Sequence, residues 1–428
     1  MKIQNFDELA TTPARKALLT IAEAGLQAID TGTVIHDTIR REGDVLMVGG
    51  EMVDLKQIDR LIFVAIGKCA ADAAMAAEEI LGDRIARGVV LDVKKCPEVK
   101  HLQAFCGTHP LPSDENLAAT EAIVATLKDL TERDLVIFVI SGGGSTLLFL
   151  PQNPNDREEI SIFNALTDAG ATIEELNTVR KHLSLARGGW LAEYAYPARV
   201  ISLIFSDVTG DDISFVSSGP TVKDATTIED AANVLAKFNV LRTCNIEKCD
   251  LVETPKDDKY FSRVKNILTV SNRKALDAMQ EQAQKLGFAA EIRDTKLIGE
   301  VVGVAEMVVS ALRQAPAKSV LLWGGETTVE IKGKGAGGRN LQLAATALDF
   351  VKDGEEILSF GSDGRDHGPY AGAICDTITK QATMDKGLEI KHFRDDNDTQ
   401  TLFEKAGNYV LTGDTGSNVS DLIIAMKE

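Results

Sequence analysis

The stretch LVIFVISGGGSTLLFLP, residues 135–151, is the part of this sequence that decides its fold class. It starts with six apolar residues in a row, as is typical of a strand buried on both faces of a parallel sheet. The run stops at three glycines, Gly142, Gly143 and Gly144, which are flanked by Ser141 and Ser145. Glycines at such a strand end let a ligand or a second backbone come close, because no side chain occupies the space.

Apolar runs of the same kind recur along the chain and alternate with segments whose apolar residues have helical spacing. In the first half of the chain this alternation predicts parallel βαβ units that helices cover on both faces, and beyond residue 262 it predicts a second α/β series. A hairpin is expected at 44–55. Strands are expected at 60–67, 87–93, 135–141 and 199–208, and in a second series at 265–272, 290–296, 318–325, 327–333, 356–364, 409–413 and 421–427. Helices are expected at 14–29, 68–81, 114–130, 173–186, 273–287, 301–315 and 341–351.

The length of 428 residues suggests two domains or three. The segment 241–262 is charged and has no clear period, so we interpret it as a connector. An N-terminal α/β domain then covers residues 1–240, and a C-terminal α/β domain covers residues 263–428.

The composition narrows the range of partners. A net charge of -18 repels nucleic acid and acidic membranes, and an aromatic content of 5% argues against stacking platforms for bases. The first residues carry no apolar targeting segment, and no later run is long enough to span a bilayer. We therefore expect a cytoplasmic protein that binds neither nucleic acid nor membrane and acts on small molecules. The sequence does not determine the oligomeric state, and a homo-oligomer is one of the possible states.

Ligands of parallel α/β sheets bind beyond the carboxyl ends of the strands. Almost every predicted strand in this chain ends in glycine accompanied by a small hydroxyl, an acidic or a basic residue. These ends are Gly67-Lys68, Ser141–Ser145, Ser206–Asp212 with Ser218–Thr221, Gly324-Gly325-Glu326, Gly333–Asn340, Gly361–Asp366 and Thr412–Asn418. Glycine-rich corners expose backbone N–H groups that favour phosphate and carboxylate, which predicts phosphoryl transfer onto a small anionic substrate.

Candidate roles follow from the residue types. Lys68 and Arg339 would offset charge on a transferred phosphoryl group. Asp207 and Asp211 would hold Mg²⁺ that carries phosphates. The structural alternative for the two aspartates is that they are turn or cap residues. For Arg339 it is an ion pair with a surface carboxylate, and for the glycine pair 324–325 it is a tight turn.

A competing pattern lies at 333–338, where three glycines satisfy G-x-G-x-x-G. Asp363 ends the next predicted strand, where a dinucleotide fingerprint carries its acidic residue. The pattern indicates a nicotinamide-dependent enzyme as the alternative. The strand before it alternates apolar and polar residues, unlike a fully buried parallel strand.

Taken together, these motifs resemble the class II glycerate kinases, the family that carries a MOFRL domain. The resemblance covers nearly the whole chain, with several motifs in the expected order. The matching motifs are GK (67–68), GTHPLPSDEN (107–116), SGGGSTLL (141–148), NTVRKHLSLARGG (177–189), SDVTGDD (206–212), SSGPTV (217–222), GGETTV (324–329), GAGGRNLQLA (335–344), GSDGRDHGPYAGA (361–373) and TGDTGSNVSDL (412–422).

The resemblance implies ATP- and Mg²⁺-dependent phosphorylation of D-glycerate, with 2-phosphoglycerate as the product of most members. It implies a Rossmann-like N-terminal domain, a C-terminal domain with the MOFRL region at about 318–428, and an active site in the cleft between them. The family's important lysine, aspartate and arginine fall on Lys68, Asp207 and Arg339. Asp207 would orient the attacking hydroxyl or hold the metal.

The same resemblance makes the corner Ser141–Ser145 a binding loop for a nucleotide phosphate or the glycerate carboxylate. Gly324, Gly325 and Glu326 are the second set of binding residues that we expect. Departures from the family pattern at Thr209, Asp414, Ser417, Arg365 and His367 bear on the exact substrate rather than on the reaction class. The alternatives are an NAD(P)H-dependent hydroxypyruvate reductase and, last, a non-enzymatic sugar-acid sensor.

Overall fold

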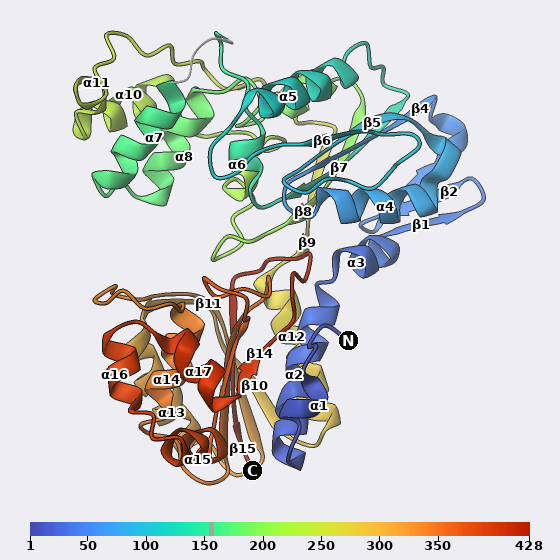
Figure 1. Cartoon of the computed structure of the whole chain (residues 1–428). Coiled ribbons are helices and arrows are strands. Elements are labelled where there is room, and N and C mark those ends of the chain that lie inside the picture. The colour runs from blue at the N-terminus through green and yellow to red at the C-terminus, as the bar shows by residue number, and fades with distance from the viewer. Residues whose placement is uncertain (154–157) are drawn as a thin grey trace. The chain divides into compact units, whose positions relative to one another are not determined.

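The computed structural model describes residues 1–153 and 158–428, which divide into two compact units (Figure 1). Unit 1 comprises Met1–Thr33, Asp207–Asp211 and Val270–Glu428, and unit 2 comprises Val34–Ser206 and Asp212–Thr269. No helix of the described residues is both long and apolar enough to cross a bilayer.

Unit 2 is built around a six-stranded sheet in the order β6-β5-β4-β7-β8-β9. Taken in chain order, this is the 3-2-1-4-5-6 arrangement of Rossmann-like proteins, as predicted for the N-terminal half. β4 pairs in parallel with β5 and β7, and every residue of β7 is buried. The strands are β4 (Arg60–Ile66), β5 (Ile85–Asp92), β6 (Gln103–Cys106), β7 (Asp134–Ser141), β8 (Arg199–Phe205) and β9 (Val264–Val270).

Helices cover both faces of this sheet, and Figure 1 shows α4 and α5 on opposite faces. The hairpin predicted at 44–55 is confirmed, because β2 and β3 pair as antiparallel strands around Gly49-Gly50. The other elements of the unit are α3 (Thr31–Thr38), which enters it, β1 (Ile39–Glu42), β2 (Val45–Val48), β3 (Glu51–Asp54), α4 (Ala70–Leu81), α5 (Asp114–Thr126), α6 (Gly144–Leu147), α7 (Glu158–Asp168), α8 (Ile173–His182), α9 (Trp190–Ala195), α10 (Ile228–Lys237) and α11 (Val240–Thr243).

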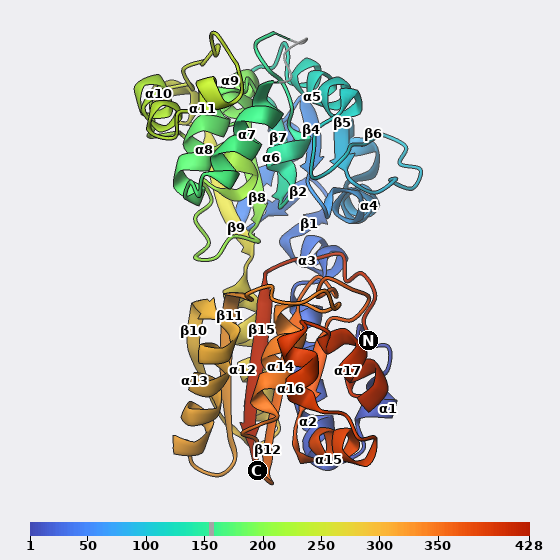
Figure 2. The ribbon, with the colours of Figure 1, turned by 60° about the vertical axis from the view of Figure 1, so that its left-hand side comes forward.

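Unit 1 holds a six-stranded sheet in the order β10-β11-β15-β12-β13-β14, and Figure 2 shows β15 between β11 and β12. β10 and β11 are parallel, whereas the other pairs are antiparallel. The second α/β series therefore forms a mixed sheet, because the last strand of the chain returns to the middle of the sheet. The strands are β10 (Ala289–Glu300), β11 (Ser319–Thr328), β12 (Glu355–Gly361), β13 (Gly372–Cys375), β14 (Tyr409–Val410) and β15 (Asp421–Lys427).

Two groups of helices enclose the sheet of unit 1 (Figure 1). α2 and α12 pack against each other on one face, and an apolar core joins α13, α14 and α17 to the other face. The helices are α1 (Phe6–Leu9), α2 (Pro13–Ala28), α12 (Asn272–Lys285), α13 (Val301–Gln314), α14 (Arg339–Ala347), α15 (Thr377–Asp385), α16 (Ile390–Asp395) and α17 (Thr399–Ala406).

The two units differ from the predicted domains 1–240 and 263–428 at three places. The N-terminal helices belong with the C-terminal half, where Arg15 forms a buried ion pair with Asp376. β9 is an edge strand of the first sheet rather than the start of the second. The predicted connector 241–262 lies within unit 2, because its apolar side chains pack against α7, α8 and α10. Each difference arises from pairing with distant residues.

Candidate active site

Lys68 and the corner Ser141–Ser145 meet at the carboxyl ends of β4 and β7 in unit 2. The backbone N–H of Lys68 donates to the carbonyl of Gly142 at 3.0 Å. A Cβ atom on Gly67 would lie 2.2 Å from Ser141 Oγ, so only glycine lets these two strand ends approach. The strand order reverses between β4 and β7, the place where sheets of this type bind ligands.

The glycines of the corner accommodate two side chains of the protein itself. Gly143 has a φ of +86°, and a Cβ atom there would lie 3.1 Å from Lys68 Cγ and 3.2 Å from its Cε. A Cβ atom on Gly144 would lie 2.1 Å from Ser217 Oγ. The lysine stem therefore runs along the glycine backbone, and Lys68 as a whole is half-buried. The anion-binding role of the corner itself stays a prediction.

A chain of hydroxyl groups continues the site from the corner to α8. Ser145 Oγ lies 2.9 Å from Ser218 Oγ, which in turn donates to Asn177 Oδ1 at 2.9 Å. Ser217 Oγ donates to the carbonyl of Ser141 at 2.6 Å. Ser217 and Ser218 both have positive φ, at +53° and +58°, a conformation that costs a non-glycine residue about 1–3 kcal/mol. Backbone strain of this kind occurs most often at ligand-binding positions.

The loop that carries His109 closes another side of this group. Thr146 Oγ1 donates to the carbonyl of Pro110 at 3.3 Å, and Asn116 Nδ2 donates to the carbonyl of Thr146 at 3.1 Å. Partial burial lowers the pKa of His109, and the positive charges of Lys68 and Arg180 lower it further. His109 is therefore neutral at pH 7. We call this group of residues in unit 2 the lysine site: Lys68, His109, Ser141–Ser145, Asn177, Arg180, Ser217 and Ser218.

Gly143→Val is expected to fold but to bind its anionic substrate at least about tenfold more weakly, a change of about 1.4 kcal/mol. The added side chain meets Lys68 and displaces it from the corner. The left-handed backbone adds a stability cost of about 1–2 kcal/mol. The Michaelis constants and the melting temperature should be measured together.

Gly170→Val is the matched control for this change. Gly170 has a φ of +75°, but nothing lies within 4 Å of the Cβ position, so the variant has a similar backbone cost without the contact. Unchanged Michaelis constants in Gly143→Val would mean that the corner is only a turn.

Arg339 opens helix α14 in unit 1 and is held by two carboxylates. Its Nε and Nη2 donate to the two carboxylate oxygens of Asp421 at 2.5 and 3.3 Å, and its Nη1 donates to Glu326 at 2.7 Å. These bonds use three of the five N–H donors of the guanidinium. Glu326 is exposed, so the structural alternative of a surface carboxylate as partner is present in the structure, and the other partner, Asp421, is buried.

A second layer of buried groups fixes this ion pair. Asn340 Nδ2 donates to Asp421 at 2.8 Å, and Asp366 accepts the backbone N–H groups of Asn340 and Leu341 at 3.1 and 2.8 Å. Burial raises the pKa of Asp421 to about 6, although Arg339 and Asn340 favour its charged form. Burial also raises the pKa of Asp366. We call Arg339, Glu326, Asn340, Asp366 and Asp421 the arginine site.

Gly324, Gly325 and Glu326 do not form the strand-to-helix corner that was predicted. All three lie inside β11, where Gly325 pairs with Leu297 on one side and with Asp421 on the other. The glycines are required by their neighbours, since a Cβ atom on Gly324 would lie 1.8 Å from Asn272 Oδ1. Their part in the site is to bring Glu326 to Arg339, while a direct role in binding substrate stays a prediction.

Asp207 and Asp211 are the first and last residues of the short middle segment that belongs to unit 1. Ser420 Oγ donates to the carbonyl of Asp207 at 3.1 Å, and a Cβ atom on Gly210 would lie 3.3 Å from Lys296 Cε. Mg²⁺ in phosphoryl-transfer enzymes is bound by one or two carboxylates with phosphates and water, and a metal-binding role for these two aspartates stays a prediction. No cluster of three acidic, His or Cys side chains in the described chain could hold a metal alone.

The G-x-G-x-x-G loop at 333–338 is already occupied by protein. Asn397 Oδ1 accepts the N–H groups of Lys332 and Gly333 at 2.7 and 2.9 Å, and Asp396 and Asp398 accept those of residues 334–336. A Cβ atom on Gly333 would lie 2.2 Å from the carbonyl oxygen of Asp396. β11 ends at Thr328, so the strand predicted at 327–333 is absent and the glycines follow no strand directly. The loop therefore lacks the context of a dinucleotide fingerprint.

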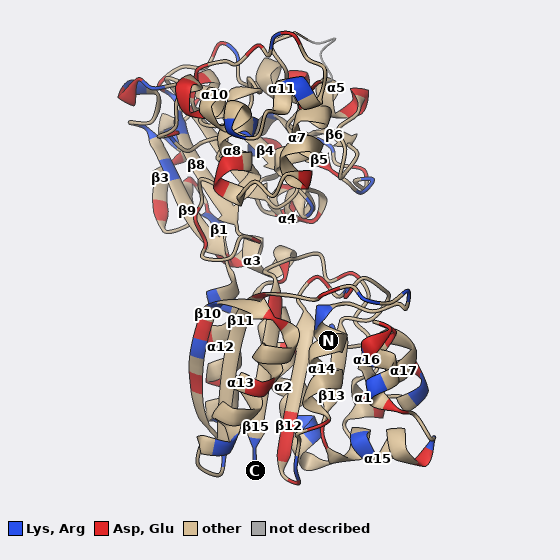
Figure 3. Ribbon diagram, turned by 90° about the vertical axis from the view of Figure 1, so that its left-hand side faces the viewer, with Lys and Arg blue, Asp and Glu red and all other residues tan. Residues whose placement is uncertain are grey.

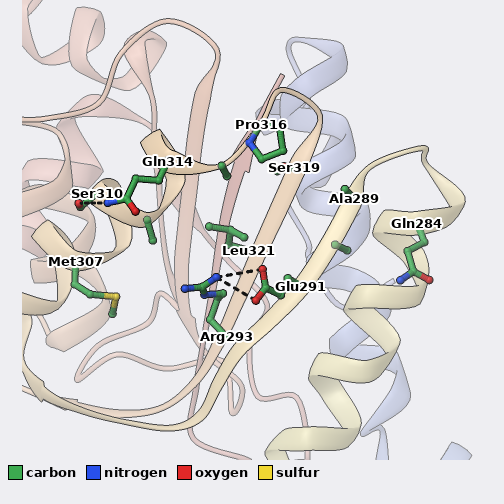
Figure 4. Close-up of a pocket in the computed structure, with 13 residues that line it drawn as sticks. Gln284, Ala289, Glu291, Arg293, Met307, Ser310, Gln314, Pro316, Ser319 and Leu321 are labelled. Carbon is green, nitrogen blue, oxygen red and sulfur yellow. Dashed lines mark hydrogen bonds and ion pairs between the residues drawn. The ribbon is translucent and has the colours of Figure 1, made fainter.

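A separate groove of about 810 Å³ lies at the opposite end of the unit 1 sheet. It runs past the first residues of β10 and β11, and Figure 4 shows the Arg293–Glu291 ion pair within it. Because ligands of such sheets bind beyond the carboxyl ends of parallel strands, we do not place the active site there.

Eight residues of the two sites were not among the predicted ones, and His109 is one of them. They were missed because Asn177 and Arg180 lie on a helix face rather than at a strand end, and because buried partners such as Asp421 cannot be paired from sequence. Their positions nevertheless fall within or beside the quoted motifs. The other seven are Asn177, Arg180, Ser217, Ser218, Asn340, Asp366 and Asp421.

Family models match both halves of the chain. The model described as domain of unknown function DUF4147 matches residues 17–253, and the MOFRL family model matches residues 319–421. The chain is 38% identical to D-glycerate 2-kinase of Thermotoga maritima, over 86% of this chain and 91% of the relative. It is 33% identical to glycerate 2-kinase of Pyrococcus horikoshii, over 96% and 97%. It is 31% identical to human glycerate kinase, over 93% and 90%.

Two crystal structures resemble the chain throughout. Glycerate kinase from Thermotoga maritima gives a TM-score of 0.85 at 33% identity, with 96% of this chain and 99% of the other covered. The PH0495 protein from Pyrococcus horikoshii gives a TM-score of 0.84 at 31% identity, with 97% and 99% covered.

Proposed function

This chain belongs to the class II glycerate kinases, the family with DUF4147 and MOFRL domains, and from this premise we propose that it phosphorylates the 2-hydroxyl of D-glycerate with ATP and Mg²⁺. That it is a glycerate kinase follows from the family. The proposal adds the position of the hydroxyl, the nucleotide and the metal. Two of the relatives named above are called 2-kinases, which supports the choice of hydroxyl.

The observation that carries the proposal is the placement of Lys68 along Gly143, at the point where the strand order reverses. A cation beside hydroxyl groups at this point suits a small anionic substrate that also carries hydroxyls. A polyanion is a poor candidate for the substrate, because the net charge is -18 and Figure 3 shows Lys and Arg interspersed with Asp and Glu along the ribbon.

The four predicted charged residues Lys68, Arg339, Asp207 and Asp211 each have a role in this proposal. Lys68 binds a phosphate or the substrate carboxylate at the glycine corner. Arg339, held by Asp421 and Glu326, offsets charge on the transferring phosphoryl group without having to reorganise. Asp207 orients the attacking hydroxyl or, with Asp211, binds Mg²⁺. When bound, the metal supplies neutralisation of phosphate charge. Catalysis then rests on positioning and electrostatics.

The hydroxypyruvate reductase alternative finds no support in the glycine loop at 333–338. Its N–H groups at residues 332–336 donate to residues 396–398, and a pyrophosphate would have to break those hydrogen bonds.

Two parallel assays on the purified protein test the proposal. The first contains D-glycerate, ATP and Mg²⁺ and follows ADP release, with enolase added to detect 2-phosphoglycerate. The second contains hydroxypyruvate with NADH or NADPH and follows absorbance. We expect ADP release that requires D-glycerate and Mg²⁺, together with an enolase signal.

The outcomes separate the parts of the proposal. ADP release without an enolase signal would place the phosphoryl group on the 3-hydroxyl. Reaction in the second assay alone would refute the roles given to Lys68 and Arg339. A cytoplasmic location and any homo-oligomer stay predictions.

A further inference from the structure

Arg180 is a cation that pairs with no carboxylate of residues 1–153 and 158–428. It lies on α8 and is half-buried, and its guanidinium carbon sits 3.9 Å above the centre of the Phe163 ring. Within the described residues, no carboxylate is within ion-pair distance of Arg180 and its guanidinium donates no hydrogen bond. Stacking on an aromatic ring holds the guanidinium plane but leaves its N–H donors available.

The position of Arg180 on its helix directs it to the lysine site. Asn177 lies three residues earlier and so on the same face of α8. Asn177 accepts the hydrogen bond of Ser218 at 2.9 Å, and Ser218 contacts Ser145 of the glycine corner at 2.9 Å. His109 experiences the positive charges of both Lys68 and Arg180. Arg180 and Lys68 are thus two cations of one site.

The neighbouring charges do not neutralise Arg180. Arg187, which is fully buried behind it, donates to the carbonyl of Arg180 at 3.2 Å and pairs with Glu159 at 2.7 Å. Burial lowers the pKa of Arg180 to about 10, the positive charge of Arg187 lowers it further, and the negative charge of Glu159 opposes this by a smaller amount. At pH 7 the guanidinium is still charged. Taking a cation out of water is costly unless an anion pairs with it, so the two cations of this site favour the binding of an anion.

We propose that Arg180 binds an anionic oxygen of a substrate in the lysine site, as a second cation beside Lys68. The oxygen belongs to the carboxylate of D-glycerate or to a phosphate of ATP, since the planar guanidinium fits both. This inference rests on the proposed function. It assigns Arg180 to binding rather than to the reacting bonds.

The test compares Arg180→Met, which keeps an apolar stem on Phe163 but removes the charge, with Arg180→Lys and with the native protein. Arg242→Met is the control, because Arg242 is an exposed arginine on the neighbouring helix α11. For each protein, kcat and the KM of both D-glycerate and ATP are measured, with the melting temperature. Loss of a charge-assisted hydrogen bond is expected to raise one KM about 10- to 100-fold in Arg180→Met.

Every outcome decides the proposal or its ligand. A raised KM for D-glycerate alone identifies the carboxylate, and a raised KM for ATP alone identifies the phosphate. Partial recovery is expected in Arg180→Lys, which restores charge without the planar fork. Unchanged KM values for both substrates would overturn the proposal. A lower kcat that is accompanied by a lower melting temperature, with both KM values unchanged, would also overturn the proposal, because it indicates a structural role.

A binding measurement separates this proposal from the proposed function. The melting temperature of the native protein and of Arg180→Met is followed with rising inorganic phosphate. If the native protein does not phosphorylate D-glycerate but is stabilised by phosphate in an Arg180-dependent way, the anion site stands and the function fails. If phosphate stabilises both proteins equally, the anion site fails whatever the activity.

Discussion

Arg339→Ala is expected to lower kcat about 10²- to 10³-fold and to change the KM values little. The reason is the geometry of the arginine site: two carboxylates hold the guanidinium in place before any substrate arrives. An N–H donor fixed in this way stabilises charge that develops in the transition state at no cost of reorganisation. Steady-state kinetics with D-glycerate and ATP measure the effect, and an unchanged kcat with only a raised KM would refute the role.

Removing Arg339 also has a structural consequence that the experiment has to separate. Asp421 is buried and would lose the partner that favours its charged form. The double variant Arg339→Gln with Asp421→Asn removes both charges and keeps polar side chains of similar size. If kcat is low in the double variant while its melting temperature is near that of the native protein, the loss belongs to catalysis. Recovery of kcat in the double variant would instead show that the unpaired Asp421 was the cause.

Arg15→Met is expected to lower the free energy of unfolding of unit 1 by about 3–5 kcal/mol, the cost of breaking a buried ion pair. Arg15 is 2% exposed. Its Nε and Nη2 donate to both carboxylate oxygens of Asp376 at 2.6 and 2.7 Å, and its Nη1 donates to Asn408 at 2.8 Å. The substitution leaves Asp376 charged and buried without this partner. The pair also attaches α2 to the C-terminal half of the chain. Its removal therefore tests whether α2 belongs to unit 1.

The two tryptophans of the chain allow each unit to be followed separately. Trp323 is buried in β11 of unit 1, and Trp190 opens α9 of unit 2. Urea unfolding is followed by fluorescence in a Trp190→Phe background and in a Trp323→Phe background. Arg15→Met should shift the transition reported by Trp323. A shift reported by Trp190 alone would favour the predicted domain 1–240 over the observed units.

Two further variants calibrate this result. Arg15→Met combined with Asp376→Leu replaces the whole pair by apolar residues and should recover much of the lost stability. Arg133→Met breaks an ion pair with Asp59 whose side chains are both more than half exposed, and it should cost less than about 1 kcal/mol. Equal losses in Arg133→Met and Arg15→Met would mean that burial is not what makes the Arg15–Asp376 pair important.

The lysine site shows how far local sequence can lead. The apolar runs before Lys68 and before Ser141 predict buried parallel strands, and the strands β4 and β7 are found there. The glycines predict a close approach, which is confirmed, but the approaching groups in the structure are the stem of Lys68 and Ser217. The identity of the approaching group could not be predicted, because Ser217 lies more than seventy residues away in the chain.

The arginine site shows the limit of the same reasoning. Sequence patterns selected Arg339 but not its partner Asp421, which lies 82 residues further along in the chain. β15 inserts between β11 and β12 and so carries Asp421 to Arg339. Gly324 and Gly325 were expected at a corner, since a glycine pair after an apolar run is typical of a turn. In the structure β11 continues through them, because β10 and β15 pair with it on both sides.

The sequence by itself determined the α/β class, the hairpin, the Rossmann-like first half and the strand ends at which Lys68 and the glycine corner lie. These features depend on apolar spacing and on glycine, which act over a few residues. Only the tertiary structure decided that the first 33 residues belong with the C-terminal half, that β9 completes the first sheet and that Asp421 holds Arg339. These features depend on which distant side chains pack together and which strand edges pair. The sequence does not determine them, because many pairings satisfy the same local pattern.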